Sequence, residues 1–283
     1  MARKFNPSKF KSDMRRIQQR QRQAVNKYNA AIRKYNREVR VHNTRVRANR
    51  EKLRREIARL NSRPTSIRYV TYRTSTQMLH ESFTRVERVS EQGRWTASDE
   101  LFEMAEGEAA NSVAVLNTLL DPTPEGAIDV AVLQQTRITN ELRDIDADLD
   151  KRWRGALFSL NPLNPDAARH FCTSSREILV KILDENAPEE DVKEWDPKIE
   201  LNEHGRVKRR DKIRYCLAQT EQDIDELVDF VDDDINNVMD VFSDFNPATH
   251  GAAGKYDLTE LDAIKTRVEG AFLFLNRIVT FDA

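Results

Sequence analysis

The sequence predicts an all-α protein in which a long N-terminal coiled-coil helix is followed by a helical bundle. Only 8 of the 283 residues are glycine and 9 are proline, which is fewer than the turns of a β-rich fold need. Charged residues make up 33% of the chain, as is typical of long solvated helices. Neither glycine nor proline interrupts the chain from Ser8 to Asn61, so we expect one continuous helix there.

The first predicted element is a coiled-coil arm over residues 1–64. Apolar and small side chains recur at alternating steps of four and three residues from Phe10 to Leu60, with one additional four-residue step after Tyr35. This spacing is a heptad seam with a single stutter. Polar residues weaken the seam at four positions, namely Gln21, His42, Asn49 and Glu56. The pattern predicts self-association through the arm.

The arm is strongly basic, although the whole chain has a formal net charge of −1. Residues 1–64 contain 21 basic and 4 acidic residues, a net charge of +17, and the remaining residues carry −18. Arginine favours bidentate contacts with phosphate or carboxylate. The arm is therefore expected to contact either nucleic acid or the acidic half of this chain or of a second copy. The candidate phosphate contacts in the arm are Arg33, Arg37, Arg40 and Arg47.

Residues 65–124 are predicted to be a helical connector. The alternating segment 67–72 favours one short strand or, equally, an extended linker. Helical periodicity follows over residues 74–91 and again up to Leu119. The sequence Asp121-Pro122-Thr123-Pro124 ends the second helix and marks the predicted domain boundary.

Residues 125–283 are predicted to be an antiparallel helical bundle. Apolar periodicity predicts helices over about 128–160, 166–185, from 206 to beyond 240, and 257–279. Ten acidic residues and no basic residue lie between 221 and 244. This run lacks the spacing of a calcium loop or of a di-iron site. We expect a solvated face or a docking face for the arm, and we predict no metal ligands.

Two basic patches in the bundle are candidate sites for nucleic acid. The patch on the second predicted helix comprises Arg169, His170, Arg176 and Glu177. The patch at the start of the third comprises Arg206, Lys208, Arg209 and Arg210, where positive charge opposes the helix dipole. Neighbouring Arg and His side chains can stabilise charge on a phosphate and transfer protons, as metal-independent RNA cleavage requires. The alternative is that Arg176 or Arg209 pairs with acidic residues of the bundle.

A further candidate lies between the last two predicted helices. The segment from Asn246 to His250 resembles the polar-x3-His end of the Arg-polar-x3-His motif of HEPN ribonucleases, which are helical bundles that usually act as dimers. By this resemblance the bundle over residues 125–283 is expected to be a HEPN-like domain, in which His250 is the acid–base group and Asn246 its polar companion. Phe245 occupies the position of the motif's arginine. A histidine that only caps or bridges this loop is the alternative.

The C-terminal part also resembles a bacterial family of predicted PIWI-associating nucleases, which are encoded in phage-defence neighbourhoods. The resemblance covers about residues 150–280. It is carried by a spaced pattern of short segments: Trp153-Arg154-Gly155-Ala156, Asn164-Pro165-Asp166, Arg169-His170, Ser174-Ser175-Arg176-Glu177-Ile178-Leu179, Ala187-Pro188 and Gly205-Arg206-Val207-Lys208-Arg209-Arg210. The resemblance implies nucleic-acid cleavage.

Together these features predict an antiviral defence protein of the cytoplasm that binds nucleic acid and, if it is a nuclease, cleaves RNA or DNA. No cofactor is expected, apart from the option of Mg²⁺ in the nuclease case. The first alternative is a non-catalytic coiled-coil subunit that assembles a defence complex with a partner from the same operon. The second is a nucleic-acid-binding scaffold. No membrane segment is expected, because no apolar run approaches the roughly 20 residues of a membrane span.

Overall fold

The structure is a computed structural model, and it describes residues 23, 27, 34, 37, 44, 45, 47–59, 69–95, 99–121, 130–161, 163–245 and 257–280. Across these ranges all regular secondary structure is helical and no strand occurs, which confirms the predicted all-α class for this part of the chain. The chain divides into two units, residues 1–58 and 59–283. None of the described helices is both long and apolar enough to span a membrane.

In the first unit, every described residue is helical, including the run 47–58. The candidate residues Arg37 and Arg47 are both helical and exposed. Arg33 and Arg40 lie outside the described residues, as does most of the heptad seam. The coiled-coil arm and its self-association therefore stay predictions.

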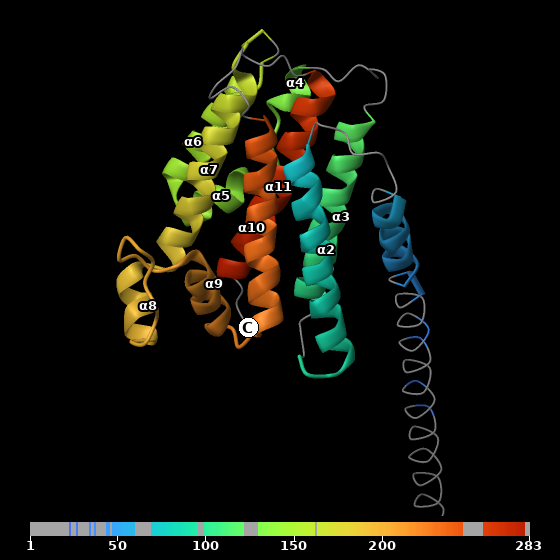
Figure 1. The fold of residues 1–283 in the computed structure, drawn as a ribbon, viewed down its shortest axis with the longest axis vertical. Coiled ribbons are helices and arrows are strands. Elements are labelled where there is room, and N and C mark those ends of the chain that lie inside the picture. Colours follow the sequence, from blue (N-terminus) through green and yellow to red (C-terminus); the bar gives the residue numbers. More distant parts are fainter. Residues whose placement is uncertain are drawn as a thin grey trace, which may run out of the picture. The chain divides into compact units, whose positions relative to one another are not determined.

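The second unit is built around four long helices that run side by side (Figure 1). They are α2 (Val70–Glu91), α3 (Asp99–Leu120), α10 (Asp225–Phe245) and α11 (Leu258–Thr280). Helix α10 packs mainly against α2, and α11 packs mainly against α3. Aromatic rings connect these helices in the core: Phe230 of α10 lies with its ring centroid 6.1 Å from that of Phe83 and 5.7 Å from that of Phe274. The segment predicted as a connector thus contributes two helices to the same core as the C-terminal helices.

Shorter helices cover one flank of these four helices (Figure 1). On this flank lie α5 (Thr139–Ile145), α6 (Ala147–Ser159), α7 (Ala167–Asn186), α8 (Glu189–Trp195) and α9 (Arg209–Ala218), whereas the short helix α4 (Val130–Leu133) packs against α11. Trp153 of α6 is fully buried and joins this layer to α11, because its ring packs edge-on against Phe272 at 5.2 Å. Its indole N–H donates a hydrogen bond to Thr136 Oγ1 at 2.8 Å, so the ring's polar group is satisfied.

Three predicted elements differ from the structure. The predicted helix 128–160 is three helices, because Asp146 is extended (φ −156°, ψ 129°) and its carboxylate accepts the backbone N–H of Asp148 as the cap of α6. The predicted helix from 206 to beyond 240 is broken into α9 and α10 at Glu221, whose φ is +57°. The predicted strand or linker over 67–72 is wrong where the structure describes it, because residues 70–72 begin α2.

Candidate nucleic-acid interface

The first predicted patch lies along α7, and its side chains do not converge on one another. Arg169 Nε and His170 Nε2 lie 3.4 and 3.5 Å from the carboxylate of Asp166, just before the helix. Glu177 accepts a hydrogen bond from Arg152 of α6 at 3.0 Å. Arg176 is exposed and forms no hydrogen bond or ion pair with any residue that the structure describes. The predicted pairing of Arg176 with bundle acids is therefore not found among these residues, and its guanidinium is accessible.

The second predicted patch is at the start of α9, and most of its cations face carboxylates. Arg209 donates from Nε to Asp232 Oδ1 at 2.7 Å and from Nη2 to Asn236 Oδ1 at 2.6 Å. Arg210 forms an ion pair with Asp229, which raises the pKa of its guanidinium. The acidic run of α10 is thus partly neutralised by α9, and the alternative interpretation holds for Arg209.

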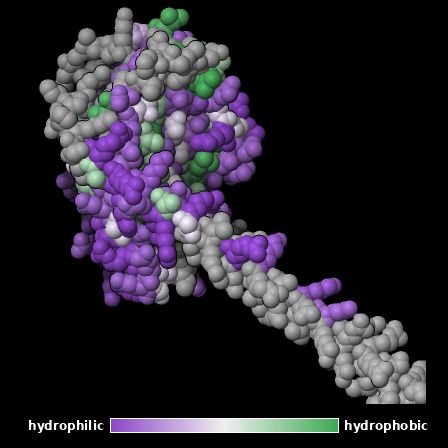
Figure 2. Space-filling view, turned by 90° about the vertical axis from the view of Figure 1, so that its right-hand side faces the viewer, coloured by the Kyte–Doolittle hydropathy of each residue, from purple (hydrophilic) through white to green (hydrophobic). Residues whose placement is uncertain are grey.

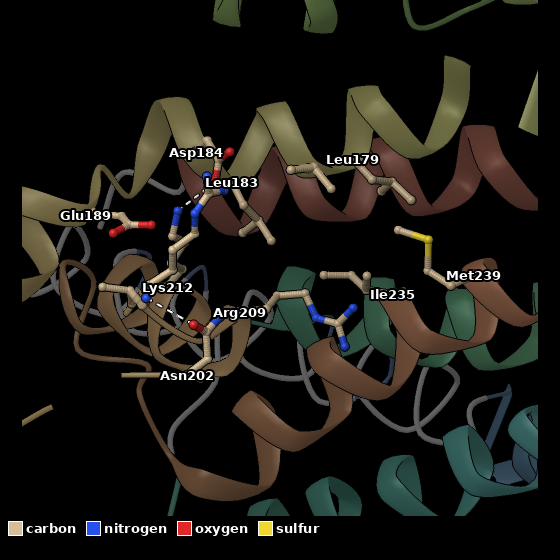
Figure 3. Close-up of a pocket in the computed structure, with 12 residues that line it drawn as sticks. Leu179, Leu183, Asp184, Glu189, Asn202, Arg209, Lys212, Ile235 and Met239 are labelled. Carbon is tan, nitrogen blue, oxygen red and sulfur yellow. Dashed lines mark hydrogen bonds and ion pairs between the residues drawn. The ribbon is translucent and has the colours of Figure 1, made fainter. Parts of the chain in front are cut away.

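Arg206 is the one member of this patch whose side chain does not pair with a carboxylate of the described residues. Lys208 Nζ donates to Glu200 at 3.3 Å, but the Arg206 side chain is exposed and has no hydrogen bond or ion pair within the described ranges. It borders a cavity of about 190 Å³ between α7, α9 and α10 (Figure 3). The cavity is lined by Leu179, Val180, Leu183, Asp184, Glu189, Asn202, Arg206, Val207, Arg209, Lys212, Ile235 and Met239.

The cavity has an apolar part and a charged part. Leu179 and Leu183 of α7 lie across from Ile235 and Met239 of α10 (Figure 3). At the charged end, Lys212 Nζ donates to Asp184 Oδ1 at 2.6 Å. The pKa of Glu189 is lowered, chiefly by its hydrogen bond with Lys193 and further by the charges of Lys212 and Arg206. Three cations and two carboxylates therefore border one cavity.

Helix α7 joins the two predicted patches. Arg169, Arg176, Val180 and Asp184 follow one another at intervals of seven, four and four residues, which places them on one side of the helix. The last two line the cavity. At about 1.5 Å per residue the series spans about 22 Å. The candidate surface is accordingly a line of α7 residues that leads from Arg169 to the cavity.

A buried polar cluster in the core escaped the sequence analysis. Arg267 of α11 is fully buried and donates to Glu108 of α3 at 2.8 Å and to Asp234 of α10 at 2.5 Å. The burial of Glu108 raises its pKa to about 8. The signal in the sequence was an arginine on the apolar face that Ile264 and Val268 define. Because the cluster is closed to solvent, it fixes the helices rather than presenting a binding surface.

A second hollow lies between α2 and α10, with a volume of about 260 Å³. It is lined by Met78, Glu81, Arg85, Asp229, Asp232 and Asp233. Among the residues that the structure describes, no group of three or more His, Cys, Asp or Glu side chains is arranged to hold a metal ion. The candidates Asn246 and His250 lie outside the described residues.

The surface of the described second unit is mostly hydrophilic on the face in Figure 2, with hydrophobic residues scattered over it.

The described part of the chain is thus an all-helical protein with a pocket that has one apolar side and one charged side. Residues 142–275, from α5 to α11, match a family described as "Predicted pPIWI-associating nuclease". The predicted family resemblance is thereby confirmed for this C-terminal part, which contains every residue of the cavity. No curated protein and no solved structure matches the chain.

Proposed function

We propose that the protein is an antiphage-defence protein that binds nucleic acid through α7 and the cavity between α7, α9 and α10. The observation that carries this proposal is the exposed Arg206, which borders the cavity and whose side chain forms no hydrogen bond or ion pair within 4 Å with the described residues, although its charge acts on nearby Glu189. Exposed Arg176 on α7 extends the same surface. Guanidinium groups without protein partners are suited to bidentate contacts with phosphate.

The proposed contacts predict a salt-dependent affinity. Each neutralised phosphate releases counterions, with a slope in log K against log salt of about −0.7 per contact for single strands. The paired cations Arg209 and Arg210 contribute less, because their charge is already balanced by Asp232 and Asp229. We expect Arg206 and Arg176 to account for more of the slope than Arg209 and Arg210.

Cleavage of RNA or DNA is the second part of the proposal. Support comes from the family description of residues 142–275 and from the sequence, in which His250 is the acid–base candidate and Asn246 its companion. Arg169, His170 and Arg176 would stabilise the charge that develops on the phosphate. The description of the family also supports association with a PIWI-like protein, which would be the defence partner.

The test uses the full chain with labelled single-stranded RNA and DNA, with and without Mg²⁺, alone and with a PIWI-like protein. Binding is measured by fluorescence anisotropy at two salt concentrations, and cleavage by gel electrophoresis. We expect the double variant Arg176→Glu/Arg206→Glu to lower the affinity at least tenfold. The matched control is Arg94→Glu, an exposed arginine in the turn after α2. Equal affinities of the Arg176→Glu/Arg206→Glu variant and the wild type would overturn the proposed surface, and intact substrate under all conditions would overturn the nuclease assignment.

A non-catalytic assembly subunit is the second candidate function. The observation that favours it is the pairing of Arg209 and Arg210 with Asp232 and Asp229 of α10, a contact of the kind that a basic arm would make with the acidic helix. Under this candidate, His250→Ala leaves protection against phage intact. Charge reversal at Arg33, Arg37, Arg40 and Arg47 abolishes protection. Deletion of residues 1–64 tests the third possibility, a nucleic-acid-binding scaffold. If the shortened protein keeps its full affinity for nucleic acid, the arm is not the binding element of such a scaffold.

A further inference from the structure

The cavity between α7, α9 and α10 has a shape and a chemistry that phosphate binding alone does not require. We propose that it holds one unstacked base of a single-stranded nucleic acid, while Arg206 binds the adjacent phosphate. This inference rests on the proposed function, because it names the form of nucleic acid that the same surface recognises. It adds a prediction that simple charge attraction does not make, namely a preference for single strands over duplex.

The apolar walls are the first argument. Two side chains of α7, Leu179 and Leu183, face Ile235 and Met239 of α10 across the cavity (Figure 3). Bases that leave a stack are commonly held between apolar or aromatic side chains. A phosphate on its own gains nothing from such walls, since a charged group next to apolar surface loses its hydration. The occupant should therefore combine a flat, weakly hydrated part with an anionic part.

The size of the cavity is the second argument. Its volume is about 190 Å³, below the roughly 300–1,000 Å³ of pockets that enclose a drug-sized ligand. It therefore suits a fragment such as one base and not several stacked bases. Arg206 is exposed at its border, so the chain to which the base belongs can continue along the surface.

The polar border is the third argument. The Oδ1 atom of Asn202 accepts the backbone N–H groups of His204 and Arg206 at 2.9 and 3.0 Å. This turn fixes Asn202 at the cavity with its Nδ2 group as a donor, and Nδ2 forms no hydrogen bond with the residues that the structure describes. An amide N–H can donate to a base edge, and the guanidinium of Arg206 can bind phosphate oxygens. The two donors are placed within one five-residue turn, as a base and its own phosphate would require.

A base inside a duplex cannot occupy the cavity without leaving its pair and its stack. A single strand avoids the loss of pairing, so the cavity should select single strands. Arg176 lies two turns before Asp184 along α7 and would bind the strand beyond the held base. Together these features form a site that should prefer single strands over duplexes and should accept different base sequences.

The experiment uses the full chain and a short single-stranded oligonucleotide that carries fluorescein at one end and one 2-aminopurine inside. Anisotropy of fluorescein reports binding, and the fluorescence of 2-aminopurine rises when that base leaves its stack. The same strand annealed to its complement is the duplex probe. We expect the single strand to bind about tenfold more tightly than the duplex and its 2-aminopurine fluorescence to rise on binding.

Two variants test the binding of the base and the binding of the phosphate separately. Val180→Trp fills the mouth of the cavity from a residue that is 49% exposed, so the core is left unchanged. It should abolish the 2-aminopurine rise and reduce the single-strand preference while anisotropy still reports binding. Val70→Trp is the matched control, because Val70 is similarly exposed at 43% and lies at the start of α2. Arg206→Ala should lower the affinity for single strands about tenfold.

The outcomes separate this inference from the proposed function. Binding of the single strand without any 2-aminopurine rise, or with equal duplex affinity, overturns the inference and leaves nucleic-acid binding in place. An unchanged or larger rise in Val180→Trp also overturns it. Absence of binding to every probe overturns the proposed function, and the inference is rejected with it.

Discussion

Two arginines of the second unit, Arg267 and Arg206, have opposite surroundings. Arg267 is fully buried in α11 and donates to Glu108, to Asp234 and, through Nε, to Asn237 Oδ1 at 2.8 Å. The Arg206 guanidinium is exposed at the border of a cavity and forms no hydrogen bond or ion pair with the described residues. The first satisfies its hydrogen-bonding groups inside the fold, whereas the second has its side-chain donors open to solvent.

The buried arginine is part of a network that connects the four long helices. Asn237 of α10 donates to Ser75 and Thr76 of α2 at 3.0 and 3.2 Å. Ser112 of α3 donates to Asn237 Oδ1 at 2.8 Å. A satisfied buried network of this kind specifies one arrangement of helices, because any shift leaves a polar group without a partner. Arginine in this protein therefore has two different environments: Arg267 is a structural cation in the core, and Arg206 is a solvent-exposed cation at the surface between α7 and α9.

The largest effect is expected from removal of the buried cation. Arg267→Met leaves the Asp234 carboxylate in the core without its counter-charge and Glu108 without its hydrogen-bond donor, so the free energy of unfolding should fall by about 3–5 kcal/mol. Urea denaturation followed by circular dichroism measures the change. Arg277→Met is the control on the same helix, because Arg277 pairs with Glu100 at the surface at 2.9 Å and should cost about 0–1 kcal/mol. Equal losses in the two variants would contradict the structural role of Arg267.

The same network predicts a dependence of stability on pH. Burial, reinforced by the charge of Asp234, raises the pKa of Glu108 from 4.5 to about 8, while Arg267 lowers it. Between these two pH values the folded state holds a proton that the unfolded state has released. The free energy of unfolding should therefore fall as pH rises from about 4.5 to about 8. Glu108→Gln should flatten this fall in urea titrations, whereas Glu81→Gln on the exposed side of α2 should preserve it.

A smaller effect is expected where α11 approaches α3 closely. A Cβ atom on Gly270 would lie 2.4 Å from Asn111 Nδ2 and 2.7 Å from Glu108 Oε1. Gly270→Ala should therefore displace both side chains and destabilise the fold by about 1–3 kcal/mol. Gly155→Ala in α6 is the control, because no atom lies within 4 Å of its added Cβ and alanine favours helices by up to about 1 kcal/mol. A thermal melt in which both variants shift in the same direction would contradict this account.

The sequence was sufficient to predict the helical class and the positions of α7 and α11, because their apolar periodicity is strong. Helix α7 at Ala167–Asn186 and helix α11 at Leu258–Thr280 lie within one residue of the predicted spans at each end. The break between α9 and α10 could not be predicted, since it depends on distant contacts. There the Trp95 indole N–H donates to Gln222 Oε1 at 2.7 Å and holds the turn that follows Glu221.

The residue types of the candidate site could be predicted from the sequence, but the ion pairs that its arginines form could not. The basic run from Arg206 to Arg210 is visible in the sequence, but the sequence does not show which guanidinium meets a carboxylate. That depends on the register between α9 and α10, which places Arg209 against Asp232 and Arg210 against Asp229. The apolar wall of the cavity was equally hidden, because Leu179 and Ile235 come from helices distant in sequence.

The smallest effect on stability, and the sharpest test of the comparison, concerns the pair of Arg209 and Asp232. Both side chains are partly exposed, at 34% and 24%, so breaking the pair should cost less than about 1 kcal/mol. Its two halves should act oppositely on nucleic-acid affinity, measured by anisotropy. Arg209→Gln removes a cation at the cavity and should weaken binding, whereas Asp232→Asn frees the guanidinium for phosphate and should strengthen it severalfold. If both variants instead destabilise the fold as much as Arg267→Met, Arg209 is a structural cation like Arg267. In that case only cations without a paired carboxylate, such as Arg206, would be available to bind an external anion.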